Sequence, residues 1–153
     1  MIDTTYLNKC ILALELANSK LDGLGNDTLE YEIYRSAIIK EFEIILEQSG
    51  KLLKKILKPY FHTSKEVDKL VFKDIFRHAG LHDLLTLEEV ERWLEYRDNR
   101  NTTSHDYGQD LANETLKLIP QFINDSKKVT THPPYFTLIN PNKIHQKTHQ
   151  NIS

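Results

Sequence analysis

The chain has 153 residues, 39% of them hydrophobic and 27% charged, a composition that predicts one folded domain and excludes wholesale disorder. Its 20 Lys and Arg against 22 Asp and Glu give a formal net charge of −2, which excludes a global basic field for nucleic acid. No apolar run is long enough for a membrane span and residues 1–9 lack the order of a signal peptide, so we expect a cytoplasmic protein without membrane association.

Apolar residues at steps of three and four predict the first two helices. The first helix is predicted over residues 4–21, with Cys10 as a small buried side chain that can form no internal disulfide. Asp27, with Glu30 three residues later, forms a capping box that predicts the start of a long second helix. We expect this helix to continue to the next proline, with a weak point or kink at Gly50.

Four lysines lie at helical spacing near the end of the second helix. They are Lys51, Lys54, Lys55 and Lys58. In a chain without a net positive charge, such a local patch is a candidate for contact with RNA. The alternative is that the four lysines are only the solvated face of a helix.

Two further capping boxes predict the next helices. Thr63 with Glu66 begins a third helix, which Gly80 should end with a left-handed cap. Thr86 with Glu89 begins a fourth helix. This helix should weaken in the Asn- and Thr-rich run that follows, because these side chains compete for backbone hydrogen bonds.

A fifth helix is predicted over residues 111–123, with a kink at Pro120. Beyond it the helical pattern stops, so we divide the chain into a helical domain, 1–125, and a polar C-terminal tail, 126–153. The histidines of the tail are too irregularly spaced to predict a metal site: His132, His145 and His149.

The predicted helices give the fold class. About five helices with short connections fold most simply as an all-α, up-and-down bundle. The apolar stripes are wide for a bundle of this size, so a homodimer is a reasonable hypothesis. We expect its apolar surface to come from four aromatic residues: Phe72, Phe76, Trp93 and Tyr96.

Residues 97–108, between the fourth and fifth helices, hold the densest group of reactive side chains in the chain. Arg100 is followed by His105 and, two residues later, by Tyr107. Histidine can move a proton near neutral pH, and arginine offers forked donors that match a phosphate. With the ribose 2′-hydroxyl as nucleophile, a site with these groups suits an endoribonuclease that needs no metal or other cofactor.

The spacing of these residues sets a geometric condition. On a continuous helix Arg100 and His105 would lie about 140° apart and would not share a face. We therefore expect the helix to break or bend between them, with Ser104 or Asp106 capping the next helix. The alternative is a structural junction, in which Arg100 pairs with an aspartate and His105 is a half-buried residue without a catalytic role.

The segment and its surroundings resemble a known protein family. The Arg-x4-His-x-Tyr spacing resembles the signature of HEPN toxins. Residues 5–125 are similar to the nucleotidyltransferase substrate-binding subfamily, through the Lys-Leu-Leu-Lys of 51–54 and the Phe-Arg-x-Ala-Gly-Leu of 76–81 among other features. The resemblance implies a helical-bundle homodimer encoded beside a minimal nucleotidyltransferase.

The resemblance also implies a role for each residue of the motif. Toxin members are metal-independent endoribonucleases, in which Arg100 would stabilise the scissile phosphate of the RNA and His105 would handle the proton. Asn101 and Ser104 match the pattern as positioning residues. The nucleotidyltransferase antitoxin would adenylylate Tyr107 and so silence the toxin. The alternative function is a non-catalytic subunit that presents a nucleotide or substrate to the nucleotidyltransferase.

Overall fold

In the computed structural model the backbone is described for residues 2–105 and 109–131, and the side chains for the same residues except 102–105 and 109–111. The elements of this part are α1 (Thr5–Leu21), α2 (Leu29–Leu57), the short 3-10 helix η1 (Lys58–Tyr60), α3 (Ser64–Asp68), α4 (Phe72–Leu81), α5 (Leu87–His105) and α6 (Gln109–Thr131). The predicted all-α class is confirmed, with six α-helices over the described ranges where about five were expected. None of these helices has the length and apolar character needed to cross a bilayer.

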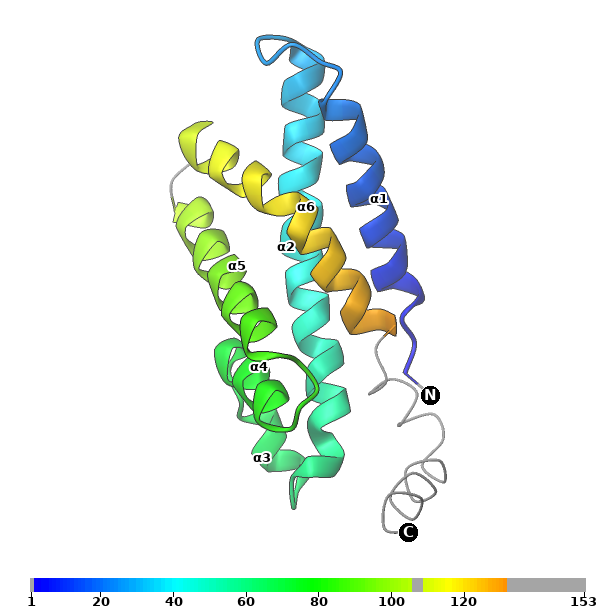
Figure 1. Cartoon of the computed structure of the whole chain (residues 1–153), viewed down its shortest axis with the longest axis vertical. Coiled ribbons are helices and arrows are strands. Elements are labelled where there is room, and N and C mark those ends of the chain that lie inside the picture. Colours follow the sequence, from blue (N-terminus) through cyan, green and yellow to red (C-terminus); the bar gives the residue numbers. More distant parts are fainter. Residues whose placement is uncertain (1, 106–108, 132–153) are drawn as a thin grey trace.

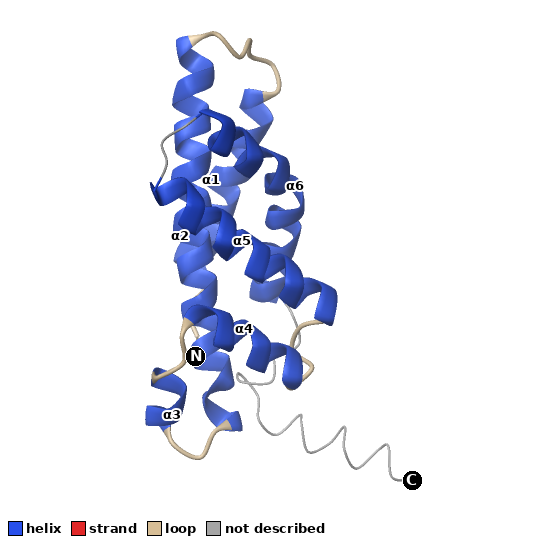
Figure 2. Cartoon of the chain, turned by 90° about the vertical axis from the view of Figure 1, so that its left-hand side faces the viewer, coloured by secondary structure: helices blue, strands red, loops and turns tan. Residues whose placement is uncertain are grey.

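The helices pack as an elongated bundle (Figure 1). α1 and α2 form an antiparallel hairpin, in which α2 is the longer partner. α6 packs against both of them, and α5 lies on the other side of α6 from α1. α4 packs on α2 and α5, near the end of the molecule that holds α3 (Figure 2). In this up-and-down bundle the C-terminal end of α5 and the N-terminal end of α6 point away from the end that holds the short helices.

The first two helices begin close to the predicted residues. α1 buries Cys10 as expected. The start of α2 differs, because Thr28 has the extended backbone of an N-cap and its Oγ1 accepts a hydrogen bond from the Tyr31 amide at 3.2 Å. The predicted capping box at Asp27 is wrong by one residue.

Gly50 lies within α2, and helical structure continues across it. A Cβ atom at this position would come within 3.1 Å of two ring atoms of Phe72 in α4. The missing side chain lets α4 approach α2 closely, so helix packing explains this glycine better than the weak point that we expected.

The single third helix that we predicted is two helices. α3 begins at the expected cap, where the Thr63 hydroxyl accepts from the Glu66 amide at 3.4 Å. It ends at Asp68, whose carbonyl accepts a hydrogen bond from Lys54 Nζ of α2 at 3.0 Å. Val71 then has extended backbone and α4 starts at the next residue. A cross-link from α2 to the end of α3 is a tertiary contact that the local pattern does not contain.

Gly80 lies inside α4, which ends at Leu81, so the predicted left-handed cap at this glycine is wrong. Among the residues that the structure describes, the one with positive φ is Asp83, at 58°. A Cβ atom on Gly80 would lie 2.9 Å from Cγ2 of the buried Val90 in α5. Gly80 is thus required by the close approach of α4 to α5.

We expect Gly80→Val to lower the free energy of unfolding by about 2 kcal/mol, because overpacking forces the side chains of a filled core to move. Gly23→Val is the matched control, since no atom lies within 4 Å of a Cβ atom at Gly23. Urea midpoints of the two variants check this expectation. Equal midpoints would contradict the role of Gly80 in packing.

The last two helices follow the predicted pattern and extend it. α5 begins with the expected capping box, in which the Glu89 amide donates to Thr86 Oγ1 at 3.1 Å and the Thr86 amide donates to Glu89 Oε1 at 3.3 Å. α6 carries Pro120 inside the helix and continues to Thr131, eight residues past the predicted end. The extension packs in the bundle because Val129 and other small side chains are buried there.

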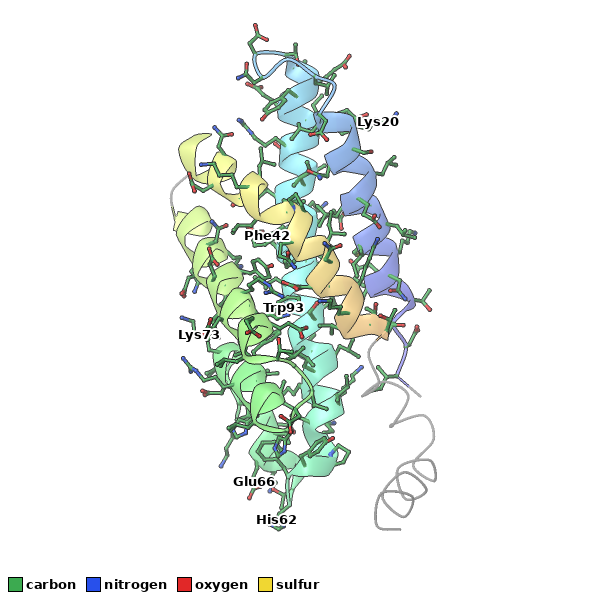
Figure 3. The ribbon with its side chains drawn as sticks, in the orientation of Figure 1. Lys20, Phe42, His62, Glu66, Lys73 and Trp93 are labelled. Carbon is green, nitrogen blue, oxygen red and sulfur yellow. The ribbon has the colours of Figure 1, made fainter. Side chains whose placement is uncertain are left out.

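Aromatic side chains from four helices meet in the core (Figure 3). The ring of Phe76 stacks on Trp93 at 4.8 Å between centroids, and Tyr96 meets Phe122 edge to face at 4.9 Å. The prediction that Phe76, Trp93 and Tyr96 supply an apolar surface is therefore wrong, because all three are fully buried. Phe72 is half-buried against the same core. Aromatic residues at helical spacing here mark the core and give no support to a dimer surface.

Candidate functional site

Arg100 and His105 lie on one continuous helix, because α5 is helical through His105. The predicted break between the two residues is wrong, since the helix ends only after His105 and α6 begins at Gln109. Helical geometry places the two Cα atoms about 140° apart around the axis and roughly 7.5 Å apart along it. A bend within α5 therefore does not bring the two residues together.

A contact with α6 occupies the first side chain of the Asn- and Thr-rich run. Thr115 Oγ1 of α6 donates a hydrogen bond to Asn99 Oδ1 at 2.6 Å, so the Asn99 side chain is used in tertiary structure and does not compete for the backbone. One residue earlier, Asp98 binds Lys73 Nζ of α4 at 2.6 Å. Both contacts involve residues of α5 directly before Arg100. They hold this turn of the helix against α4 and α6.

A buried ionic network joins α5 to α6 in the middle of the bundle. The Asp125 carboxylate, fully buried, accepts two hydrogen bonds from the Arg92 guanidinium, each 2.8 Å long. It also accepts from Tyr96 Oη at 2.6 Å and from Gln121 Nε2 at 3.2 Å. Forked arginine–carboxylate pairs hold orientation as well as charge. The network therefore helps to set how α5, the helix that carries Arg100 and His105, lies on α6.

The protonation states of this network follow from its contacts. Burial alone would raise the pKa of Asp125, but the hydrogen bonds from Arg92, Tyr96 and Gln121 outweigh it and hold the pKa below its ordinary value. Burial, together with the hydrogen bond to the Asp125 carboxylate, raises the pKa of Tyr96 far above the ordinary value. At neutral pH the network is thus a carboxylate held by a guanidinium and a neutral phenol.

The predicted site residues fall partly inside and partly outside the described residues. Arg100 is half-buried and Asn101 is exposed, both in the last turns of α5. Ser104 and His105 have a described helical backbone, whereas their side chains, and Tyr107 as a whole, lie outside the described residues. The convergence of Arg100 and His105 on one phosphate therefore stays a prediction.

Metal ligands do not gather in the described part of the chain. No group of three or more His, Cys, Asp or Glu side chains there is placed to hold a metal ion. Residues 126–131 of the predicted tail, 126–153, belong to α6. The rest of the tail lies outside the described residues, and with it His132, His145 and His149.

Two hollows lie on the surface. One, of about 300 Å³, is lined by the four lysines that the sequence singled out, at the end of α2 and the start of η1, together with the start of α1. The other, of about 330 Å³, is lined by Asn26, Tyr31, Arg35, Asn113 and Leu116. Sequence reasoning missed this second hollow because its lining comes from a loop, α2 and α6, which only the fold brings together.

Sequence reasoning also missed the Asp125 network, although a signal was present. Asp125 follows Phe122 by three residues and so continues the apolar stripe of α6 onto the buried face. A charged residue at such a position is almost never fully buried unless it is paired. The stripe therefore indicates that Asp125 has an ionic partner on another helix. It does not identify the helix or the residue.

Comparisons with known proteins agree with this architecture. The chain is similar to "Probable ribonuclease HepT" of Haemophilus influenzae, with 34% identity over 88 residues, which is 58% of this chain and 59% of that protein. The aligned part thus spans less than two thirds of that relative. Among solved structures, it is similar to HI0074 of Haemophilus influenzae, described as revealing the fold of a substrate binding domain of a nucleotidyltransferase. The TM-score is 0.70 at 26% identity, covering 83% of this chain and 96% of that one.

A second solved structure, from Thermus thermophilus, matches with a TM-score of 0.58 at 25% identity, covering 76% of this chain and 95% of that one. The model of the family described as "Nucleotidyltransferase substrate binding protein like" matches residues 4–132, which include all six α-helices. The resemblance that the motif suggested is therefore confirmed at the level of the family. This chain belongs to the nucleotidyltransferase substrate-binding-like proteins, the family with which its helical bundle and its sequence both agree.

Proposed function

We propose that the chain is the toxin subunit of a toxin–antitoxin pair with a minimal nucleotidyltransferase, and that it is a metal-independent endoribonuclease. The observation that carries the proposal is the spacing of Arg100, His105 and Tyr107 in the sequence of a member of this family, with Arg100 and His105 in the last turns of α5. The name of the Haemophilus influenzae relative, a probable ribonuclease, supports it. The proposed setting is the cytoplasm, where the RNA substrate and the antitoxin are found together.

In the proposed mechanism, His105 removes the proton from a ribose 2′-hydroxyl, and the 2′-oxygen attacks the adjacent phosphorus. The bond from phosphorus to the 5′-oxygen breaks, and the leaving oxygen takes up a proton. The products are a 2′,3′-cyclic phosphate and a 5′-hydroxyl. Arg100 stabilises the charge that grows on the phosphoryl oxygens, and Asn101 and Ser104 position the strand.

The continuous α5 helix adds a condition to this mechanism. Because Arg100 and His105 lie about 140° apart on the helix, a single chain does not present both on one face. We therefore propose a homodimer in which the C-terminal ends of the two α5 helices meet around one RNA-binding cleft. Each phosphate would then be contacted by groups from both chains, so a monomer would be inactive.

The proposed inhibition acts on Tyr107. The antitoxin would transfer AMP from ATP to the phenolic oxygen, forming a bond from oxygen to the α-phosphorus and releasing pyrophosphate. The added AMP carries negative charge and bulk two residues from His105, where it repels and blocks the RNA backbone.

Product analysis tests the proposal. We expect the purified chain to cut RNA in the presence of EDTA and to leave 2′,3′-cyclic phosphate ends. Treatment with ATP and the nucleotidyltransferase encoded beside the chain should stop this cleavage in the wild-type protein. The Tyr107→Phe variant should cut RNA and resist the treatment. Cleavage that EDTA abolishes, or RNA that stays intact with the dimer at micromolar concentration, would contradict the proposal.

A second candidate function is a non-catalytic subunit that binds a nucleotide or substrate for the nucleotidyltransferase. The hollow between α2 and α6 favours it, because Arg35 can donate hydrogen bonds to a phosphate and Asn113 offers an amide for a base. The Arg35 guanidinium lies 5.9 Å from the centre of the Tyr31 ring, so the cation and the aromatic ring lie side by side in this hollow. This function predicts that ATP binds the wild-type chain and not Arg35→Gln, while neither protein cuts RNA. Calorimetry together with the cleavage assay separates the two functions.

A further inference from the structure

The hollow at the C-terminal end of α2 has an unusual concentration of positive charge. Its volume is about 300 Å³, and it lies between the last turns of α2, the start of α1 and the end of α3. Three lysines of α2 and the first residue of η1 line it: Lys51, Lys54, Lys55 and Lys58. Two aspartates, Asp3 and Asp68, also line it and leave an excess of two positive charges. We call this hollow the lysine pocket.

The two aspartates are partly used by the fold. The Asp3 carboxylate accepts a hydrogen bond from the Thr5 amide at 2.9 Å, which holds it at the start of α1. The Asp68 carbonyl accepts from Lys54 Nζ at 3.0 Å, so this lysine is tied to α3. The other three lysines form no ion pair within the described residues. Lys55 interacts electrostatically with the Asp3 carboxylate and helps to lower its pKa, while the ammonium groups of Lys51 and Lys58 are available to an anion from outside.

The helix dipole does not account for all of this charge. Lysines in the last turn of a helix interact favourably with its C-terminal end, which explains Lys54 and Lys55. Lys51 lies one turn earlier, beyond the range of this effect. Tyr6 also lines the pocket and is 55% exposed, so an aromatic ring borders the same hollow as the lysines. Cations that follow a groove beside an aromatic ring are the pattern of a single-strand nucleic-acid site.

We propose that the lysine pocket is a second RNA-binding site, which holds the phosphate backbone of a single strand away from the motif on α5. Lys51 and Lys58 are seven residues apart, so the cations extend over roughly 10 Å of helix, long enough for more than one phosphate. The net charge of the chain is −2, so attraction to RNA must come from such a local surface. The proposal rests on the proposed function, for which RNA is the substrate.

The distance between the lysine pocket and the motif on α5 follows from the helix geometry. Arg97 of α5 and Glu47 of α2 lie 3.9 Å apart, between Nη1 and Oε2, and so mark the same level on the two helices. The helices run in opposite directions (Figure 1). With a rise of 1.5 Å per residue, His105 lies roughly 20–30 Å along the bundle from the lysine pocket. Only a strand of several nucleotides reaches both sites, so the pocket selects for longer RNA.

The test compares two double variants that remove equal charge. The pocket variant, Lys51→Gln together with Lys55→Gln, removes two exposed cations from the pocket and keeps good helix formers on α2. Lys20→Gln with Lys117→Gln is the control, because both lysines are exposed and neither lines the pocket. Lys20 lies at the opposite end of α1 (Figure 3). Circular dichroism verifies that both proteins are folded.

Each variant is measured with a strand of about 20 nucleotides, longer than the roughly 4–16 that one binding domain covers, and with a dinucleotide. A 2′-deoxy strand that resists cleavage gives affinity by fluorescence anisotropy. We expect the pocket variant to bind it about tenfold more weakly at physiological salt and to lose about 1.4 from the slope of log affinity against log salt. Dinucleotide cleavage should be unchanged in both variants, and the control should bind as the wild type does.

Three results would overturn the proposal. One is an equal loss of affinity in the pocket variant and the control, which would indicate a general effect of charge. Another is unchanged binding in the pocket variant. The third is displacement of the strand by millimolar inorganic phosphate with no dependence on RNA length, which would indicate a small-anion site. If the wild type cuts neither RNA, the ribonuclease proposal fails, while anisotropy with the uncleavable strand still decides whether the pocket binds RNA.

Discussion

His105→Ala is expected to lower the rate of RNA cleavage by about 10²–10⁴-fold, because it removes the group that moves the proton in the proposed mechanism. Binding of an uncleavable strand should change little, since the imidazole acts on the proton and not on the backbone charge. The measurement is the single-turnover rate of cleavage with enzyme in excess. Growth arrest on expression should disappear with the same substitution.

The matched control for this experiment is His62→Ala. His62 is exposed at the far end of the bundle, beside η1, and far from the end of α5 (Figure 3). We expect this variant to cut RNA at the wild-type rate and to arrest growth. If His105→Ala is as active and as toxic as the wild type, the assignment of the catalytic base is wrong and only the substrate-binding function remains.

The fold was largely predictable, because each helix carries its own local signal. The Thr86–Glu89 capping box and the buried Cys10 are confirmed, since caps and apolar stripes depend on neighbours within a few residues. The errors arise at positions where contacts with another helix determine the structure. The sequence predicts a helix end at Gly80, whereas the glycine is required there because Val90 of α5 packs too close to allow a side chain. One predicted helix is instead α3 and α4, and Lys54 of α2 donates a hydrogen bond to the last carbonyl of α3 at this interruption.

The candidate site was less predictable, for the same reason. Local composition predicted that α5 breaks between Arg100 and His105, whereas the hydrogen bond of Asn99 to Thr115 takes up a side chain that was expected to weaken the helix. The types of residue and their spacing indicate the chemistry. How they meet depends on α6, and in the proposed dimer on a second chain, neither of which the local pattern contains.

Asp125→Ala is the substitution with the largest expected effect on stability. It leaves the Arg92 guanidinium and the Tyr96 hydroxyl without their acceptor between α5 and α6, and breaking a buried pair from one side costs about 3 kcal/mol or more. Asp98→Ala is the matched control, since it removes the same group from the exposed pair with Lys73 and should cost less than about 1 kcal/mol. Urea unfolding near neutral pH measures both.

The dependence on pH identifies the ionised carboxylate as the source of this stability. Because its partners lower the pKa of Asp125 in the folded chain, its contribution is complete above the pKa of an unfolded aspartate, about 3.9, and is lost as the pH falls through the folded value. The difference between the wild type and Asp125→Ala should therefore shrink in acid. A difference that stays constant down to the lowest pH at which the wild type folds would show that packing, and not the ionised carboxylate, holds α5 on α6.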